Sequence, residues 1–192
     1  MPSDWLAARR SEVAADRILD AAQELFAEQN AATVGMREIA KAAGCSRATL
    51  YRYFDSRDTL FTAYVNRETY RLYQEIGEQI GALADPGERL VEAIMTSVRT
   101  VRQRPALASW FAGSARPIGG DLAEQSEVIK ALVTAFLTSL GQGDPSVVER
   151  RARWVVRVIT SLLAFPGEDE AAERAMLEEF VVPTVAPVVV EP

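Results

Sequence analysis

The residues best suited to chemistry in this 192-residue sequence carry positive charge and hydrogen-bond donors, and they gather within residues 33–57. That segment holds five basic residues against two acidic ones, a net charge of +3, whereas the whole chain carries −6. Arg47 and Arg52 can each bind a guanine edge with two parallel hydrogen bonds, and the methyl group of Thr49 can contact that of thymine. A basic island on an acidic chain turns one face toward phosphates. These residues therefore favour nucleic-acid recognition.

Catalytic chemistry is restricted by the absence of histidine from the chain. Ser-His-Asp and Cys-His catalysis are excluded within it. A zinc site would need carboxylates and the single thiol, Cys45, and no cluster has the spacing of metal ligands. The 11 glycines form neither GxGxxG nor GxxxxGK. We therefore expect neither an enzyme nor a cofactor or metal site. The alternative from another functional class is an enzyme or carrier that only resembles a DNA-binding protein.

The elements that must position these side chains are helices, because apolar residues recur at helical spacing nearly everywhere. The pattern predicts an all-α protein of about nine helices, divided into residues 1–57 and a larger domain, 58–192. The main helices are expected at 14–28, 37–43, 47–53, 87–103, 122–140, 146–164 and 169–181, with one further long helix that starts after Ser56 and stops before Asp85. Residues 106–112 should bring Trp110 inward, and the tail 183–192 should be loosely ordered.

Targeting signals are not apparent in the sequence. No run of 18 apolar residues is present, and residues 1–10 lack the apolar core of a signal peptide. A single cysteine fits a reducing compartment. We expect a cytoplasmic protein that does not span a membrane.

Residues 36–55, MREIAKAAGCSRATLYRYFD, have the pattern of two helices that cross through a tight turn. Gly44 suits left-handed backbone at the end of the first helix, and Ser46 suits the N-cap of the second. Ile39 and Leu50 should enter the shared core. The second helix then presents Arg47 and its neighbours at an outward N-terminal end, the geometry that enters a major groove.

The segments RILDAAQELFAE and TVGMREIAKAAGCSRATLYRYFDSRDTLF, within residues 17–61, resemble the TetR family of bacterial regulators in order and spacing. The resemblance implies a homodimer that binds an operator in double-stranded DNA, with a pocket for a small-molecule effector in the larger domain. It places Arg47, Thr49, Tyr51 and Arg52 in or beside the groove, although Tyr51 could instead prop the helix. The remaining implied contacts, all toward the sugar-phosphate backbone, are Thr33, Arg37, Tyr53 and Arg57. Many relatives have histidine at the position of Tyr53 and lysine at that of Arg57.

The effector pocket is predicted less directly, because bulky residues at helical spacing are first of all core residues. Large apolar side chains can nonetheless wall a cavity, and Arg102 lies at an apolar boundary where it could bind an anionic group. The candidate effector-binding residues are Met95, Arg102, Trp110, Phe136 and Trp154.

The helix at 146–164 is apolar over so much of its circumference that it must be covered on two sides. We expect a symmetric copy to cover one side through Ala152, Val156 and Leu163, forming a four-helix bundle. Such a dimer would read a pseudo-palindromic operator. The sequence thus predicts a repressor released by a small, largely apolar effector; an activator, or a DNA-binding protein without an effector, is the alternative.

Overall fold

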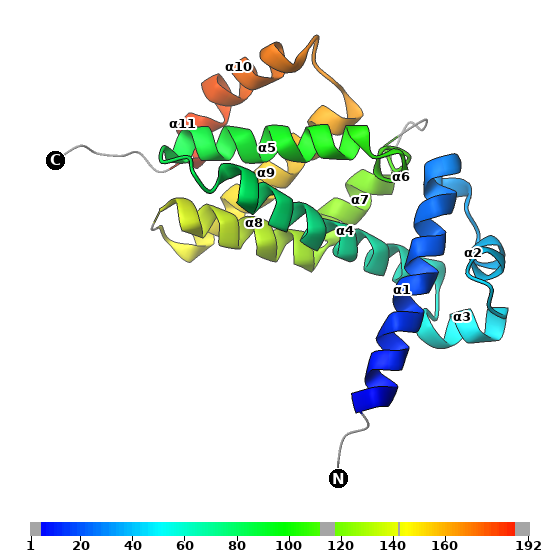
Figure 1. Ribbon diagram of the computed structural model, residues 1–192. Helices are drawn as coiled ribbons and strands as arrows, with labels where there is room; N and C mark the ends of the chain where they lie inside the picture. The colour runs from blue at the N-terminus through cyan, green and yellow to red at the C-terminus, as the bar shows by residue number, and fades with distance from the viewer. Residues whose placement is uncertain (1–4, 112–117, 142, 187–192) are drawn as a thin grey trace.

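The computed structural model describes residues 5–111, 118–141 and 143–186, with side chains described from residue 11 onward (Figure 1). Within these ranges the regular elements are eleven α-helices and one short 3₁₀ helix. This confirms the predicted all-α class, with a small N-terminal head and a larger helical body. In the same part of the chain, no helix combines the length and apolar character needed to cross a membrane.

The head consists of α1 (Trp5–Glu28), a 3₁₀ turn (Ala31–Thr33), α2 (Met36–Ala42), α3 (Arg47–Tyr53) and the first turns of α4 (Arg57–Ile80). Its core contains Phe26, Ile39 and Leu50 and continues along α4 to Tyr64, past the predicted boundary at residue 57. In Figure 1 the long α1 stands across the end of the body, with α2 and α3 on its far side. The head is therefore fused to the body through α4.

The body contains the rest of α4 and seven further helices. These are α5 (Pro86–Gln103), α6 (Pro105–Ala108), α7 (Ile118–Gln125), α8 (Glu127–Leu140), α9 (Pro145–Ala164), α10 (Glu170–Phe180) and α11 (Val182–Val185). In Figure 1, α5 runs across the body, with α10 and α11 on one side and α8 on the other. Leu90, Ile94, Met95 and Val98 of α5 are fully buried, as expected for a helix in the middle of the fold.

Three helix boundaries differ from the sequence-based prediction. The first helix begins at Trp5 rather than near residue 14. The predicted helix 122–140 is two helices, because Ser126 has extended backbone and caps α8 by accepting a hydrogen bond from the Ile129 N–H. Residues 182–185 form α11, with Pro183 in its first turn, where the missing N–H needs no partner. The rest of the predicted loose tail, 187–192, lies outside the described residues.

Candidate functional site

The turn between α2 and α3 has the geometry that its residue types predict. Gly44 has a φ of +66°, which is left-handed backbone. The Ser46 hydroxyl accepts a hydrogen bond from the Thr49 N–H at 3.0 Å, so the serine caps α3. Half-buried Cys45 packs against the head core, and its N–H bonds the Ala40 carbonyl at 3.0 Å. The predicted cap, turn and core contacts are confirmed, and together they fix the direction of α3.

One face of the head presents the predicted nucleic-acid contacts to solvent. Arg37, Arg47, Tyr51 and Arg52 are exposed. The Arg47 guanidinium lies over the Tyr51 ring, 5.8 Å from its centroid, and Arg52 lies over the half-buried Tyr53 at 5.2 Å. Guanidinium groups packed on aromatic rings keep their N–H groups available while losing some conformational freedom. Thr33 is exposed, whereas Thr49 is half-buried and hydrogen-bonds Ser46.

The guanidinium of Arg57 is engaged within the head. Its Nε donates to the Val34 carbonyl at 3.0 Å. Its Nη2 donates to the carbonyls of Ala31 at 3.1 Å and Ala32 at 2.6 Å. The guanidinium also lies over the Phe61 ring, 4.4 Å from its centroid. Arg57 thus ties the start of α4 to the loop before α2, and only its Nη1 hydrogens are left by these contacts.

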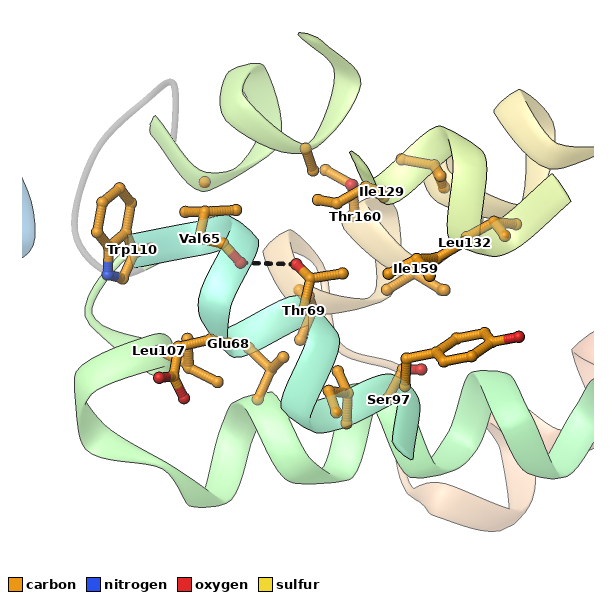
Figure 2. Close-up of a pocket in the computed structure, with 18 of the residues that line it drawn as sticks. Val65, Glu68, Thr69, Ser97, Leu107, Trp110, Ile129, Leu132, Ile159 and Thr160 are labelled. Atoms are coloured by element: carbon orange, nitrogen blue, oxygen red, sulfur yellow. Dashed lines mark hydrogen bonds between the residues drawn. The ribbon is translucent and has the colours of Figure 1, made fainter. Parts of the chain in front are cut away.

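The body contains an apolar cavity of about 170 Å³, which we call the main cavity, between α4, α5, α7, α8 and α9. Figure 2 shows Val65 and Thr69 of α4 facing Ile129 and Leu132 of α8, with Trp110 at one end. Ile159 and Thr160 add wall from α9 and Ser97 from α5. A largely apolar enclosure with a few polar groups is the usual form of a small-molecule site.

The polar groups of the main cavity differ in what they can offer a ligand. The Thr69 hydroxyl donates to the Val65 carbonyl at 2.7 Å and the Ser97 hydroxyl to that of Ala93 at 2.7 Å, so both oxygens can still accept. The indole Nε1 of Trp110 is buried without a hydrogen-bond partner among the described residues. Glu68 is only 5% exposed and bonds the Arg71 guanidinium at 2.8 Å. Glu68 lies near the Trp110 end of the cavity (Figure 2), and its charge is balanced by Arg71 and also by Arg67 at 3.4 Å and Arg104 at 4.0 Å.

A second cavity, also of about 170 Å³, adjoins the main one toward the far end of α4. Both cavities are bordered by six of the same residues: Tyr73, Ile76, Ser97, Leu132, Val133 and Ile159. Its wall includes Phe136 of α8 and Arg89 of α5. The two cavities therefore lie side by side in the body, with these shared side chains between them.

An aromatic cluster joins the main cavity to the head. Phe26 of α1 makes edge-to-face contacts with Phe61, Tyr64 and Trp110 at centroid distances of 5.0–5.3 Å. Tyr64 stacks on Trp110 with an interplanar angle of 9°, and burial raises the pKa of the Tyr64 hydroxyl above its usual value. Trp110 is therefore part of both the head core and the cavity wall.

The predicted effector-binding residues separate into three groups. Trp110 lines the main cavity and Phe136 the second cavity. Met95 is buried in the body core and borders neither. Arg102 is paired with Glu173, and Trp154 is 50% exposed on the outer surface. Met95, Arg102 and Trp154 therefore line neither cavity.

Two charged cavity residues, Glu68 and Arg89, were missed by the sequence analysis. Glu68 follows Tyr64 by four residues on the apolar stripe of α4, and Arg89 precedes Ala93 and Ser97 by four and eight on α5. A lone charge at helical spacing on an apolar face was the signal that marks them. Both were missed because, in the sequence alone, each resembles an ordinary charged residue on a protein surface.

The residues predicted to meet a second copy lie inside the chain. Ala152 and Val156 are 1% and 5% exposed within the body, and Leu163 lines the main cavity. The outward apolar side chains nearby are instead Trp154, Phe165, Met176 and Phe180, which are 50%, 79%, 45% and 60% exposed. Trp154, Met176 and Phe180 border a surface groove of about 330 Å³ between α9 and α10. We call the exposed side chains of Trp154, Phe165, Met176 and Phe180 the apolar patch.

The head, with a capped second helix that carries exposed arginines, defines a helix-turn-helix DNA-binding protein. Residues 18–64 match the family model described as bacterial regulatory proteins, tetR family. An uncharacterised HTH-type transcriptional regulator of Mycobacterium tuberculosis is 64% identical over 96% of this chain and 92% of its own length. The chain belongs to the TetR family of transcriptional regulators.

Solved structures resemble the whole fold. The TetR family repressor AlkX of a Dietzia strain, implicated in biodegradation of n-alkanes, is 25% identical, with a TM-score of 0.68 over 89% of this chain and 98% of its own. RolR in complex with resorcinol is 19% identical, with a TM-score of 0.65 over 88% of this chain and 89% of its own. The second likeness supports the fold alone.

Proposed function

We propose that this DNA-binding regulator is a cytoplasmic homodimeric repressor that leaves a pseudo-palindromic operator when a small, largely apolar effector occupies the main cavity. The observation that carries the proposal is the double role of Trp110, which lines the cavity and packs against Phe26 of α1. A ligand that displaces the indole must also shift the head core, because close-packed interiors transmit displacement.

Recognition of DNA is assigned to the exposed face of α3. Arg47, Tyr51 and Arg52 enter the groove with the Thr49 methyl group beside them, while Thr33, Arg37 and Tyr53 bind the sugar-phosphate backbone. The exposure of both arginines and the capped start of α3 support this assignment. Arg57 acts chiefly by holding the loop before α2, which contains Thr33.

Dimerisation is assigned to the apolar patch of Trp154, Phe165, Met176 and Phe180 on α9 and α10. Three of these exposed side chains, Trp154, Met176 and Phe180, border one groove, and large apolar side chains gathered on a surface indicate a contact surface. Pairing around a two-fold axis would give a four-helix bundle and hold two α3 helices about 34–36 Å apart, or a multiple of this spacing, to match successive turns of DNA.

The effector class follows from the cavity. Its volume of about 170 Å³ and its apolar wall favour a small hydrophobic molecule with few polar groups. The implication of AlkX in n-alkane biodegradation is consistent with a molecule of this kind.

A cavity-filling variant tests the proposal. Leu132→Trp places an indole in the main cavity, and fluorescence anisotropy would follow binding to DNA from upstream of the gene during titration with a panel of small apolar compounds. We expect wild-type protein to release DNA with some of them, and the variant to bind DNA but resist release. Equal release from both proteins would contradict the assignment of the cavity.

A further inference from the structure

Arg89 has no ion-pair partner among the described residues and lies in a largely apolar wall. It is half-buried on α5 and lines the second cavity with residues such as Ile80, Ile94 and Phe136. Its Nε is fully buried and has no hydrogen-bond partner, and among the described residues no carboxylate lies within ion-pair distance of the guanidinium. Partly burying an unpaired charge is unfavourable unless a counter-charge compensates it. The arginine thus indicates an anionic group on whatever occupies this cavity.

Each of the two cavities is lined by one charged residue, and of these two Glu68 is ion-paired whereas Arg89 has no ion pair among the described residues. Glu68 lines the main cavity and Arg89 the second cavity, whose α4 wall ends at Gly77 and Ile80. Glu68 and Gly77 are nine residues apart on one helix, which corresponds to about 14 Å along its axis. The wall between them is supplied by apolar side chains and the Tyr73 ring. An elongated apolar body with one charged end fits this arrangement.

We propose that the effector is an amphipathic monocarboxylate, with its carboxylate on Arg89 and its apolar body running past Tyr73 and Ile159 into the main cavity. This inference rests on the proposed function and deepens it. A planar guanidinium binds a carboxylate through two parallel hydrogen bonds. The main cavity offers no such partner, because the charged residue that lines it is Glu68, whose carboxylate already pairs with Arg67, Arg71 and Arg104. Arg89 therefore sets both the ligand class and the cavity that holds its charged end.

The test compares three probes with similar ten-carbon chains, namely decanoate, decanol and decylamine. Their affinities for the full chain would be measured by isothermal titration calorimetry. Because a hydrogen-bonded charge pair adds about 1.5–3 kcal/mol, we expect decanoate to bind at least about tenfold more tightly than decanol. Decylamine should bind more weakly than decanoate.

Variants then test whether Arg89 causes the preference for decanoate over decanol. Arg89→Met, which keeps the apolar stem, should remove the decanoate preference and leave decanol affinity unchanged, and Arg89→Lys should restore part of the preference. Arg99→Met is the matched control, because Arg99 lies on the same helix and faces Glu170 at 3.4 Å on the surface. Thermal melting would confirm that each variant is folded. Unchanged decanoate affinity in Arg89→Met, or equal binding of decanoate and decanol by wild-type protein, would overturn the inference.

DNA release separates this inference from the function on which it rests. If decanol releases operator DNA as well as decanoate, and Arg89→Met changes neither, the carboxylate assignment is wrong while ligand-controlled repression holds. If decanoate binds with the expected selectivity and DNA affinity does not change, the carboxylate site holds and the proposed mode of release is wrong.

Discussion

Arg102 on α5 and Glu173 on α10 form a two-pronged ion pair, with Nη2–Oε1 at 2.6 Å and Nη1–Oε2 at 2.8 Å. Arg102 also donates to the Leu162 carbonyl of α9 at 2.8 Å, and Glu173 accepts the Gly167 N–H at 2.8 Å. The pair therefore joins three helices and the loop that connects two of them. Because α9 and α10 carry the apolar patch, it fixes the surface on which dimerisation is proposed.

We expect Glu173→Gln to lower the free energy of unfolding by about 3 kcal/mol, because removing one partner of a buried pair leaves the other uncompensated. Glu173 is 1% exposed, whereas the Arg102 side chain is 35% exposed, so water can compensate the guanidinium only in part. Chemical denaturation at pH 7 would measure the change. Glu178→Gln on the exposed side of α10 is the control and should have little effect, because exposed ion pairs contribute little. Equal stability of the two variants would contradict a structural role for the pair.

The same pair predicts an acid-dependent loss of stability. The hydrogen bond from Arg102 holds the pKa of Glu173 below its usual value. A carboxyl with a depressed native pKa stabilises the fold above its unfolded pKa, near about 4.3, and loses that contribution as pH falls through the native pKa. Wild-type stability should therefore fall more steeply below about pH 4.5 than that of Glu173→Gln. Parallel pH profiles would contradict this.

A feature of the fold or the site could be predicted from the sequence where the spacing of nearby residues determines it. The helix-turn-helix was predictable because Gly44, Ser46, Ile39 and Leu50 each act within a few residues of their position. Helical periodicity identified α5 as central, since five of its apolar residues fall on one wide stripe. These features need no knowledge of the partner across the fold.

The ligand site and the contact surface were less predictable because they depend on how distant helices pack. Periodicity showed that α9 is apolar on two sides, but it did not distinguish the side that α5 and α8 cover from the outward side of Trp154. Arg102 looked like a ligand for an anion because Glu173 lies 71 residues away in sequence. The sequence pattern predicts which face of a helix is apolar, whereas tertiary packing determines which residues that face contacts.

Gly44→Ala tests the turn that aims α3. A Cβ at this position would meet no atom within 4 Å, so its cost is the left-handed backbone itself, about 1–2 kcal/mol. Gly77→Ala is the matched control in the last turn of α4, where a Cβ also has open space. The control should stabilise by about 0.5–1 kcal/mol. A shift of the melting temperature in the same direction for both variants would contradict the assigned turn.

Arg57→Ala should weaken DNA binding indirectly, by releasing the loop before α2. We expect a loss of about 2 kcal/mol of stability from its carbonyl hydrogen bonds, measured by denaturation without DNA. Arg37→Ala, at an exposed arginine of the same head, should leave stability unchanged and reduce affinity for all DNA sequences alike. Equal stability of both variants would show that Arg57 is a surface contact only.

The apolar patch predicts which substitutions separate the dimer. Trp154→Glu or Phe180→Glu should give folded monomers and lose specific DNA binding, because a charge would enter the interface. Val13→Glu is the control at a 61% exposed valine on α1 and should stay dimeric. Light scattering and circular dichroism would separate dissociation from unfolding. Dimeric Trp154→Glu and Phe180→Glu proteins would place the interface elsewhere.

Binding to base variants of the gene's upstream DNA tests the central claim most directly, that α3 reads sequence through Arg47 and Arg52. Wild-type protein should prefer its site over scrambled DNA by at least about 10³-fold, with affinity that falls steeply with salt. Arg47→Ala and Arg52→Ala should each cost about 1–3 kcal/mol and relax preference at one base pair of each half-site. A uniform loss across all DNA sequences, or no preference in wild-type protein, would contradict the account.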